Sequence, residues 1–259
     1  MALSNIEKHY NKHPEDLRLQ RRHGIVEFST TMHHLHRFLQ PDSFILDIGA
    51  GTGRYTSALM AEGYKVKAIE LVRRNIEVFL KREPTADVVQ GDARQMSFLP
   101  TGMADVTLLL GPLYHLIGDD EKLKALNEAK RVTKPGGLIF VAYLMNEYSL
   151  LSYCFDEERI NDLLAHGFVD AQYHLHVQEG ELYDYVRLED INRLNEKAGL
   201  ERVTIFSPDG AADYMRTRLN QMSEETFARF IEYQQCISER PDLIGAGSHT
   251  VDVVRCPLQ

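Results

Sequence analysis

Apolar residues gather in short runs along the chain, and amphipathic segments separate these runs. Seven runs have the length and apolar or alternating character of strands, at residues 44–48, 64–70, 86–93, 104–110, 138–144, 200–206 and 250–254. Segments with helical spacing lie between them, at residues 55–62, 75–81, 121–130 and 188–198. The run at 104–110 is nearly continuous, as expected for a central parallel strand. The pattern predicts a doubly wound α/β fold with a mostly parallel sheet of seven strands.

A further helix is predicted before the first strand, from Gly24 onward. Its apolar residues recur every three or four positions, at Ile25, Phe28, Met32, Leu35 and Leu39. Six of the 11 histidines lie within the first 40 residues. His33 and His36 fall on one helical face, but no carboxylate motif accompanies them. We therefore interpret this group as a solvated helix face and predict no metal site.

A glycine-rich turn follows the first strand. Gly49, Gly51 and Gly53 come directly after Asp47 and Ile48, and a helical segment begins next. A strand, a glycine turn and a helix start form the nucleotide-binding corner of such sheets, where a side chain would collide with the ligand. A dinucleotide fingerprint requires another glycine at position 54, which is Arg54 in this chain.

The segment from Asp47 to Gly53 resembles motif I of the class I S-adenosylmethionine (SAM) dependent methyltransferases. The resemblance implies a Rossmann-like methyltransferase fold in which the glycines pass under the methionine part and the ribose. It also implies that Asp47 supports the turn and the amino group. The cofactor-binding residues implied in this way are Tyr10, Asp47, Gly49, Ala50, Gly51, Gly53, Arg54, Glu70, Leu71, Asp92, Ala93, Leu110 and Gly111.

Two acidic residues follow at positions that suit a nucleoside. Glu70 ends the second predicted strand, about twenty residues after Gly49, where a carboxylate can accept hydrogen bonds from both ribose hydroxyls. The alternative for Glu70 is a surface residue at a strand end. The resemblance implies that Asp92, after Gly91, faces the adenine; the alternative is a simple turn residue. We favour the nucleoside role for both.

A second motif follows the fourth predicted strand. Residues 111–116 read Gly-Pro-Leu-Tyr-His-Leu, which is similar to a motif in a group of bacterial small-molecule methyltransferases. Tyr114 and His115 are the candidate catalytic residues, bordering the sulfonium and the acceptor. His115 is either a general base, since its ordinary pKa lies near neutrality, or a histidine that holds the loop through the backbone. The Lys-Pro-Gly-Gly segment at 134–137 predicts a tight turn before strand 138–144.

Two segments exceed a minimal methyltransferase domain, at residues 147–187 and 208–243. The first is rich in tyrosine, phenylalanine and histidine and is predicted to be a lid that encloses an apolar or planar acceptor. The alternative is a helical addition with its own small core. We predict a helical N-terminal cap at residues 1–40 and a SAM-binding domain at 41–259 that carries both lid insertions.

Composition narrows the possible partners. The 259 residues carry a formal net charge of −9, which disfavours binding to nucleic-acid phosphates. The three cysteines are scattered, which argues against disulfides and a zinc site. No apolar run of membrane-spanning length and no signal-peptide pattern occurs, so we expect a cytoplasmic protein without a membrane partner, as a monomer or homodimer.

The sequence therefore predicts a methyltransferase that moves a methyl group from SAM to an O, N, S or C atom of a small molecule. No Asp- or Asn-Pro-Pro-Tyr or -Phe motif follows the fourth strand, which argues against methylation of nucleic-acid bases. One rival is a non-catalytic SAM-binding regulatory or scaffold protein. The other is a nicotinamide-dependent oxidoreductase, which Arg54 disfavours.

Overall fold

The computed structural model describes residue 6, residues 21–178 and residues 180–258. Seven strands form one sheet in the order β3-β2-β1-β4-β5-β7-β6. The strands are β1 (Phe44–Ile48), β2 (Lys65–Glu70), β3 (Asp87–Gln90), β4 (Ala104–Leu109), β5 (Thr133–Leu144), β6 (Glu201–Phe206) and β7 (His249–Arg255). Only β7 runs antiparallel to its neighbours, β5 and β6. The predicted seven-stranded, mostly parallel sheet is confirmed.

The helices of the described residues follow the predicted alternation. They are α2 (Arg22–His36), α3 (Arg54–Ala61), α4 (Arg73–Arg82), η2 (Pro112–His115), α5 (Asp119–Val132), α6 (Asn146–Ser149), η3 (Leu150–Phe155), α7 (Ile160–Ala165), α8 (Leu188–Ala198), α9 (Arg216–Gln221) and α10 (Glu224–Ile237). None of the helices that the structure describes combines the length and apolarity needed to cross a membrane.

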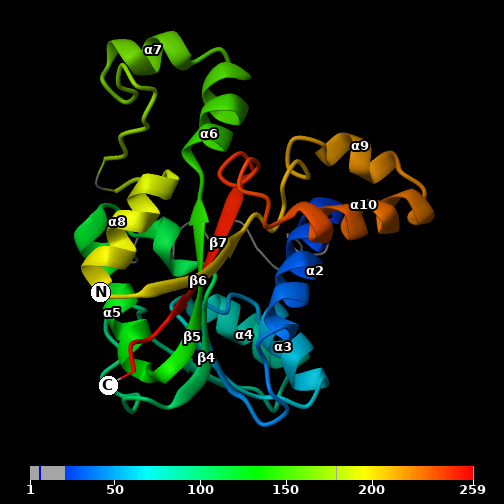
Figure 1. Ribbon diagram of the computed structural model, residues 1–259, viewed down its shortest axis with the longest axis vertical. Coiled ribbons are helices and arrows are strands. Elements are labelled where there is room, and N and C mark those ends of the chain that lie inside the picture. Colours follow the sequence, from blue (N-terminus) through cyan, green and yellow to red (C-terminus); the bar gives the residue numbers. More distant parts are fainter. Residues whose placement is uncertain (1–5, 7–20, 179, 259) are drawn as a thin grey trace.

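The two faces of the sheet bury separate hydrophobic cores. Along β5, Ile139 and Val141 point into one core with α5 and α8, whereas Phe140 and Ala142 point into the other with α2 and α3. This follows from the two-residue period of a strand, which sends successive side chains to opposite faces. Figure 1 shows α5 and α8 on one side of the central strands and α2 and α3 on the other. The sheet is therefore packed between two helical layers.

Strand β5 begins at Thr133 rather than at residue 138, which corrects its predicted boundary. Thr133 pairs with Ala104 and Leu138 pairs with Val106, so residues 134–137 bulge out between these two pairs. Gly136 has a φ of +75°, a conformation that favours glycine. The Lys-Pro-Gly-Gly segment therefore interrupts the strand as a bulge, instead of preceding it as a separate turn.

The two insertions lie at the same end of the sheet (Figure 1). Helices α6, η3 and α7 project beyond β5 and carry a small core of their own around Leu150, Cys154 and Val169. Helices α9 and α10 instead pack on α2 through Val26, Leu219 and other apolar side chains. The first insertion is thus partly independent of the main core, and the second is continuous with the N-terminal helix.

Candidate active site

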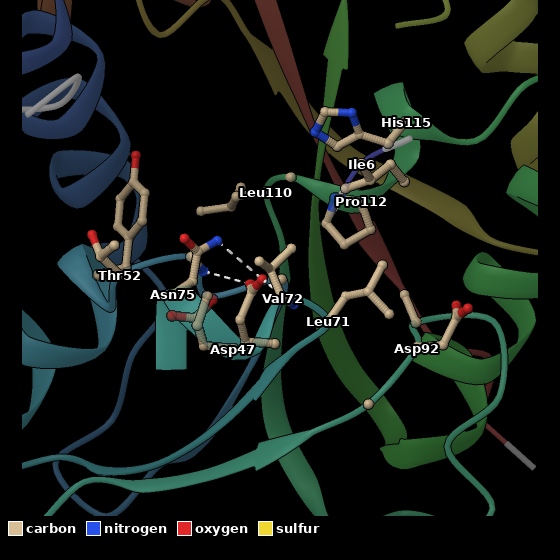
Figure 2. Close-up of a pocket in the computed structure, with 18 of the residues that line it drawn as sticks. Ile6, Asp47, Thr52, Leu71, Val72, Asn75, Asp92, Leu110, Pro112 and His115 are labelled. Atoms are coloured by element: carbon tan, nitrogen blue, oxygen red, sulfur yellow. Dashed lines mark hydrogen bonds between the residues drawn. The ribbon is translucent and has the colours of Figure 1, made fainter. Parts of the chain in front are cut away.

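A pocket opens at the carboxyl ends of β1, β2 and β4, where open α/β sheets bind ligands (Figure 2). Most of the residues proposed from the sequence line this one pocket: Asp47, Gly49, Ala50, Gly51, Arg54, Glu70, Leu71, Asp92, Ala93, Leu110, Gly111, Tyr114 and His115. Residues separated by almost seventy positions in the chain therefore share one cavity, as the order of the motifs predicts.

Gly53 is placed differently from the other proposed residues that the structure describes. Gly53 is not among the pocket residues; a Cβ built on it would lie 2.2 Å from the ring of Phe79. Its φ is +80°, so glycine at this position serves the packing of α4 against the turn. Tyr10 lies outside the described residues. Ile6, which the structure does describe, lines the pocket.

Gly49 and Gly51 differ in what surrounds them. A Cβ on Gly49 would lie 2.6 Å from the ring of Pro112, so this glycine allows the loop after β4 to approach the turn. Gly51 has a φ of +58°, and a Cβ built on it meets no atom within 4 Å. Because Gly51 lines the pocket, that open space belongs to the cavity. The turn thus leaves an open space beside Gly51, which a side chain at this position would enter and which we call the cradle.

Glu70 ends β2 beneath this cradle and is only 5% exposed. Its carboxylate accepts the backbone N–H of Gly51 at 2.8 Å and the backbone N–H of Val72 at 2.8 Å. The side-chain amide of Asn75 donates to the same carboxylate at 3.2 Å (Figure 2). Burial raises the pKa of Glu70, and the donated hydrogen bonds oppose that rise. Glu70 therefore fixes the glycine turn and presents a carboxylate to the pocket.

Asp47 is buried within β1 and lies at the base of the pocket. Its carboxylate accepts a hydrogen bond from the hydroxyl of Thr56 at 2.6 Å, which ties β1 to the first turns of α3. Burial raises the pKa of Asp47 to about 6, and the nearby charge of Glu70 adds to the rise. Asp47 therefore holds β1 to the helix that follows the glycine turn, and its support of the turn itself stays a prediction.

Asp92 lies at another side of the pocket, apart from His115 in Figure 2. The guanidinium of Arg94 donates to both of its carboxylate oxygens, at 3.0 Å from Nε and 2.6 Å from Nη2. Burial by itself would raise the pKa of Asp92, but the hydrogen bonds from Arg94 outweigh it and hold that pKa below its usual range. Asp92 is thus an oriented, ionised acceptor.

Tyr114 and His115 form the short helix η2 over the pocket. The Nδ1 atom of His115 lies 2.9 Å from the carbonyl oxygen of Leu182, in the first insertion, and donates to it. The His115 ring also lies 5.1 Å from the ring of Tyr183, centre to centre. The backbone N–H of Asp184 donates to the carbonyl of Tyr114 at 2.8 Å. The first insertion is therefore anchored to the candidate catalytic residues.

Several further residues line the pocket that the sequence analysis did not propose as site residues, although Gly91, Pro112 and Leu116 lie within its motifs. They are Ile6, Thr52, Tyr55, Val72, Asn75, Arg82, Gly91, Arg94, Pro112 and Leu116. Asn75 and Arg94 had a usable signal, since each follows a proposed acid by a few positions and has a polar group long enough to reach back. Arg82 had none, because it ends α4 and reaches the carbonyl of Thr52 only through the folded turn.

Comparison with known families gives a match to a methyltransferase domain over residues 46–141. A demethylmenaquinone methyltransferase from Renibacterium salmoninarum is 35% identical over 102 residues, which cover 39% of this chain and 41% of that protein. A cypemycin N-terminal methyltransferase from Streptomyces is 32% identical over 99 residues, covering 38% of this chain and 40% of that protein. The chain thus spans about two fifths of the length of the curated relatives it matches.

Solved structures extend the likeness to nearly the whole fold. A SAM-dependent methyltransferase from Methanosarcina mazei aligns with a TM-score of 0.59 at 17% identity, over 87% of this chain and 98% of the other. A possible histamine N-methyltransferase from Thermotoga maritima aligns with a TM-score of 0.58 at 20% identity, over 97% of both chains. At this identity the alignments establish the fold and leave the acceptor open.

The family match begins within β1 and ends within β5, so it includes the glycine turn, Glu70, Asp92 and η2. The pocket geometry and the match therefore agree on the same segment. Residues 46–141 thus match a methyltransferase domain within a seven-stranded sheet, which supports the resemblance to class I SAM-dependent methyltransferases and S-adenosylmethionine as the cofactor.

Proposed function

We propose that this protein transfers the methyl group of SAM to a small-molecule acceptor at the pocket between the glycine turn and η2. The observation that carries the proposal is the buried Glu70 carboxylate beside the open cradle at Gly51. In this proposal Glu70 binds the ribose hydroxyls, Asp92 faces the adenine, and Asp47 supports the turn beneath the amino acid part. SAM supplies a methyl group already activated by a positive sulfur, so the protein mainly has to orient the acceptor.

His115 is the proposed general base. Because Nδ1 donates to the carbonyl of Leu182, a neutral His115 carries its proton on Nδ1 and Nε2 is the basic nitrogen. This hydrogen bond also holds the loop, so both roles that the sequence leaves open are compatible in one residue. An acceptor with an acidic O–H or N–H would pass its proton to Nε2, whereas a thiolate or a neutral amine would need no base.

The aromatic surroundings favour a planar acceptor. The rings of Tyr114, His115 and Tyr183 lie 4.8–6.2 Å from one another, centre to centre. Asp184 next to them forms an ion pair with the buried Lys122 and accepts the N–H of Gly118 at 2.8 Å. These contacts support the role of residues 147–187 as an acceptor lid. The N-terminal cap predicted at residues 1–40 also stays a proposal, which two observations on its described part support: α2 packs beside the second insertion, and Ile6 lines the pocket.

The experiment is methyl transfer from isotopically labelled SAM to a panel of small molecules. The panel should include hydroxylated aromatic rings, because several curated relatives are demethylmenaquinone methyltransferases. A product carrying one added methyl group, formed with release of the demethylated cofactor, supports the proposal. Tight SAM binding with no transfer to any class of acceptor would support the rival, a non-catalytic SAM-binding protein.

A further inference from the structure

Three buried side chains with metal-ligating atoms meet outside the cofactor pocket. Glu27 comes from α2, Asp209 from the loop after β6, and His249 is the first residue of β7. One nitrogen of His249 and one carboxylate oxygen from each acid all lie within 4.8 Å of one another. The exposed fractions of Glu27, Asp209 and His249 are 9%, 1% and 8%. We call these three residues the Glu-Asp-His triad.

The loop that carries Asp209 is closely packed and is held by hydrogen bonds. The Asp209 carboxylate accepts Nδ1–H of His249 at 2.7 Å and the backbone N–H of the same histidine at 3.1 Å. A Cβ on Gly247 would lie 2.7 Å from Asp209 Oδ1. A Cβ on Gly210, whose φ is +52°, would lie 2.2 Å from the side chain of Gln234, which itself donates to the Ser207 carbonyl at 2.8 Å. Asp209 and His249 are therefore held in place before any ligand arrives.

The charges of the triad are not balanced among its members. Two carboxylates face one imidazole, so the ionised triad stays negative even if His249 is protonated. Asp213 lies nearby, but Arg216 pairs with it at 2.7 Å and its charge is compensated there. Among the described residues, His23 lies 4.0 Å from Asp213, and the hydroxyl of Tyr214 is also close enough to interact with Asp209 and Asp213. Buried like charges are costly unless a cation or hydrogen bonds compensate them.

We propose that Glu27, Asp209 and His249 bind a divalent first-row transition metal ion. Two oxygens and one imidazole nitrogen suit ions such as Mn²⁺ or Zn²⁺. The ion would replace the proton shared by His249 Nδ1 and Asp209 Oδ2. Neighbouring ligands with bonds of about 2.1 Å lie about 3.0 Å apart in octahedral geometry and about 3.4 Å apart in tetrahedral geometry, so the pair, now 2.7 Å apart, has to separate by less than about 1 Å. The sequence pattern missed this triad because its residues come from three distant parts of the chain.

The triad lies next to the proposed acceptor side. The ring of His249 is 6.1 Å from the ring of Tyr114, which lines the pocket. Both insertions lie at this end of the sheet, and α2 packs against the second of them (Figure 1). An ion here would lie beside Tyr114 rather than among the glycine-turn contacts. Metal binding can therefore be measured on its own, whether or not methyl transfer is established.

The test is direct metal binding by tag-free protein that has been treated with a chelator and then dialysed. Titration with Mn²⁺ and Zn²⁺, with elemental analysis after gel filtration, should give one ion per chain. Asp209→Asn, His249→Ala and Glu27→Gln should each weaken binding at least tenfold, while SAM binding stays as in the wild type and shows that each variant is folded.

The matched control is another Asp–His pair in the described chain. His176 Nε2 lies 3.0 Å from Asp170 Oδ2 on the surface, with the histidine side chain 56% exposed. Asp170→Asn and His176→Ala should leave the ion stoichiometry and affinity unchanged. The proposal is overturned if the wild type retains no ion. It is also overturned if the Asp209→Asn and Glu27→Gln variants bind ions as tightly as the wild type does. Loss of binding in the surface-pair variants alone would also overturn it.

Discussion

The carboxylate of Glu70 accepts the backbone N–H of Gly51 at 2.8 Å, and this contact joins the end of β2 to the turn after β1. One acid therefore does two things. It fixes the shape of the glycine turn, and it forms part of the pocket wall. In a buried setting a charge-assisted hydrogen bond of this kind is stronger than a neutral one. The geometry of the turn thus depends on the same side chain that we propose binds the ribose.

Replacing Glu70 should weaken cofactor binding. Glu70→Gln keeps the size and removes the charge, and Glu70→Ala removes every contact. We expect each to weaken SAM binding by about 1.5–3 kcal/mol, the scale of a hydrogen bond to a charged group. Calorimetric titration with SAM measures the effect. The control is Glu77→Gln on α4, whose exposed side chain pairs only with exposed Arg73 among the ion pairs of the described chain. A dissociation constant unchanged in both Glu70 variants would remove this residue from the site.

Alanine substitutions at two glycines distinguish the effect of backbone strain from the effect of filling the pocket. Gly51 (φ +58°) and Gly63 (φ +95°) both adopt conformations that L-residues rarely take, and a Cβ on either meets no atom within 4 Å. Each substitution by alanine should destabilise the fold by about 1–2 kcal/mol. Only Gly51 lines the pocket, so only Gly51→Ala should weaken SAM binding by tenfold or more. Equal SAM affinity in the two variants would contradict a cofactor cradle at residue 51.

The two roles of His115 can be separated once an acceptor is identified. His115→Asn retains a side-chain N–H that can replace the donor to Leu182, but it removes the basic nitrogen. For an acidic acceptor we expect both His115→Asn and His115→Ala to lower kcat about 10²–10⁴-fold, the usual size of a general-base contribution. SAM affinity should change little. Full activity in His115→Asn with loss only in His115→Ala would assign His115 to holding the loop.

The stability of the protein should fall between pH about 6.5 and 4 because of His34. Its ring stacks on Phe206 at 3.8 Å, and Arg37 donates to its Nδ1 at 2.9 Å. Burial lowers the pKa of His34 from its ordinary value of 6.5 to about 4. In that interval the unfolded chain binds a proton that the folded chain does not, so the free energy of unfolding decreases as pH falls.

Thermal unfolding as a function of pH tests this contribution. His34→Gln should lower stability at pH 7 and flatten the decrease between pH 6.5 and 4, whereas His36→Gln should leave the slope unchanged. His36 is suitable because it is exposed and pairs only with Glu62 among the ion pairs of the described residues. Asp47, with its raised pKa, acts in the opposite direction, so the comparison is made between variants. Parallel curves for the wild type and His34→Gln would contradict the assignment.

The sheet and most of the pocket could be predicted because their signals are local. The glycine turn and η2 each follow a strand, Glu70 ends one, and the carboxyl ends of parallel strands lie on one edge. Contacts made through long-range packing left no such signal. Gly53 was proposed as a ligand contact because it shares the turn, yet it is not among the pocket residues, and a Cβ on it would collide with the ring of Phe79 on α4. The start of β5 was misplaced because a bulge at 134–137 resembles a turn in sequence.

The burial of the histidines in α2 could not be predicted from the sequence either. His33, His34 and His36 are equivalent in sequence, but the fold buries His34 against β6 and leaves His36 in an exposed ion pair. Only tertiary packing distinguishes them. Likewise, nothing near His249 in the sequence points to Asp209 or Glu27, which the fold brings to it from another loop and another helix.

Calorimetric titration of the purified protein with SAM, its demethylated product and NADH tests the central claim most directly. We expect both adenosyl compounds to bind with dissociation constants on the micromolar scale, about −8 kcal/mol. NADH should give no binding heat, because Arg54 occupies the position of the third glycine of a dinucleotide site. Absence of binding by both adenosyl compounds, or binding of NADH in their place, would contradict the account.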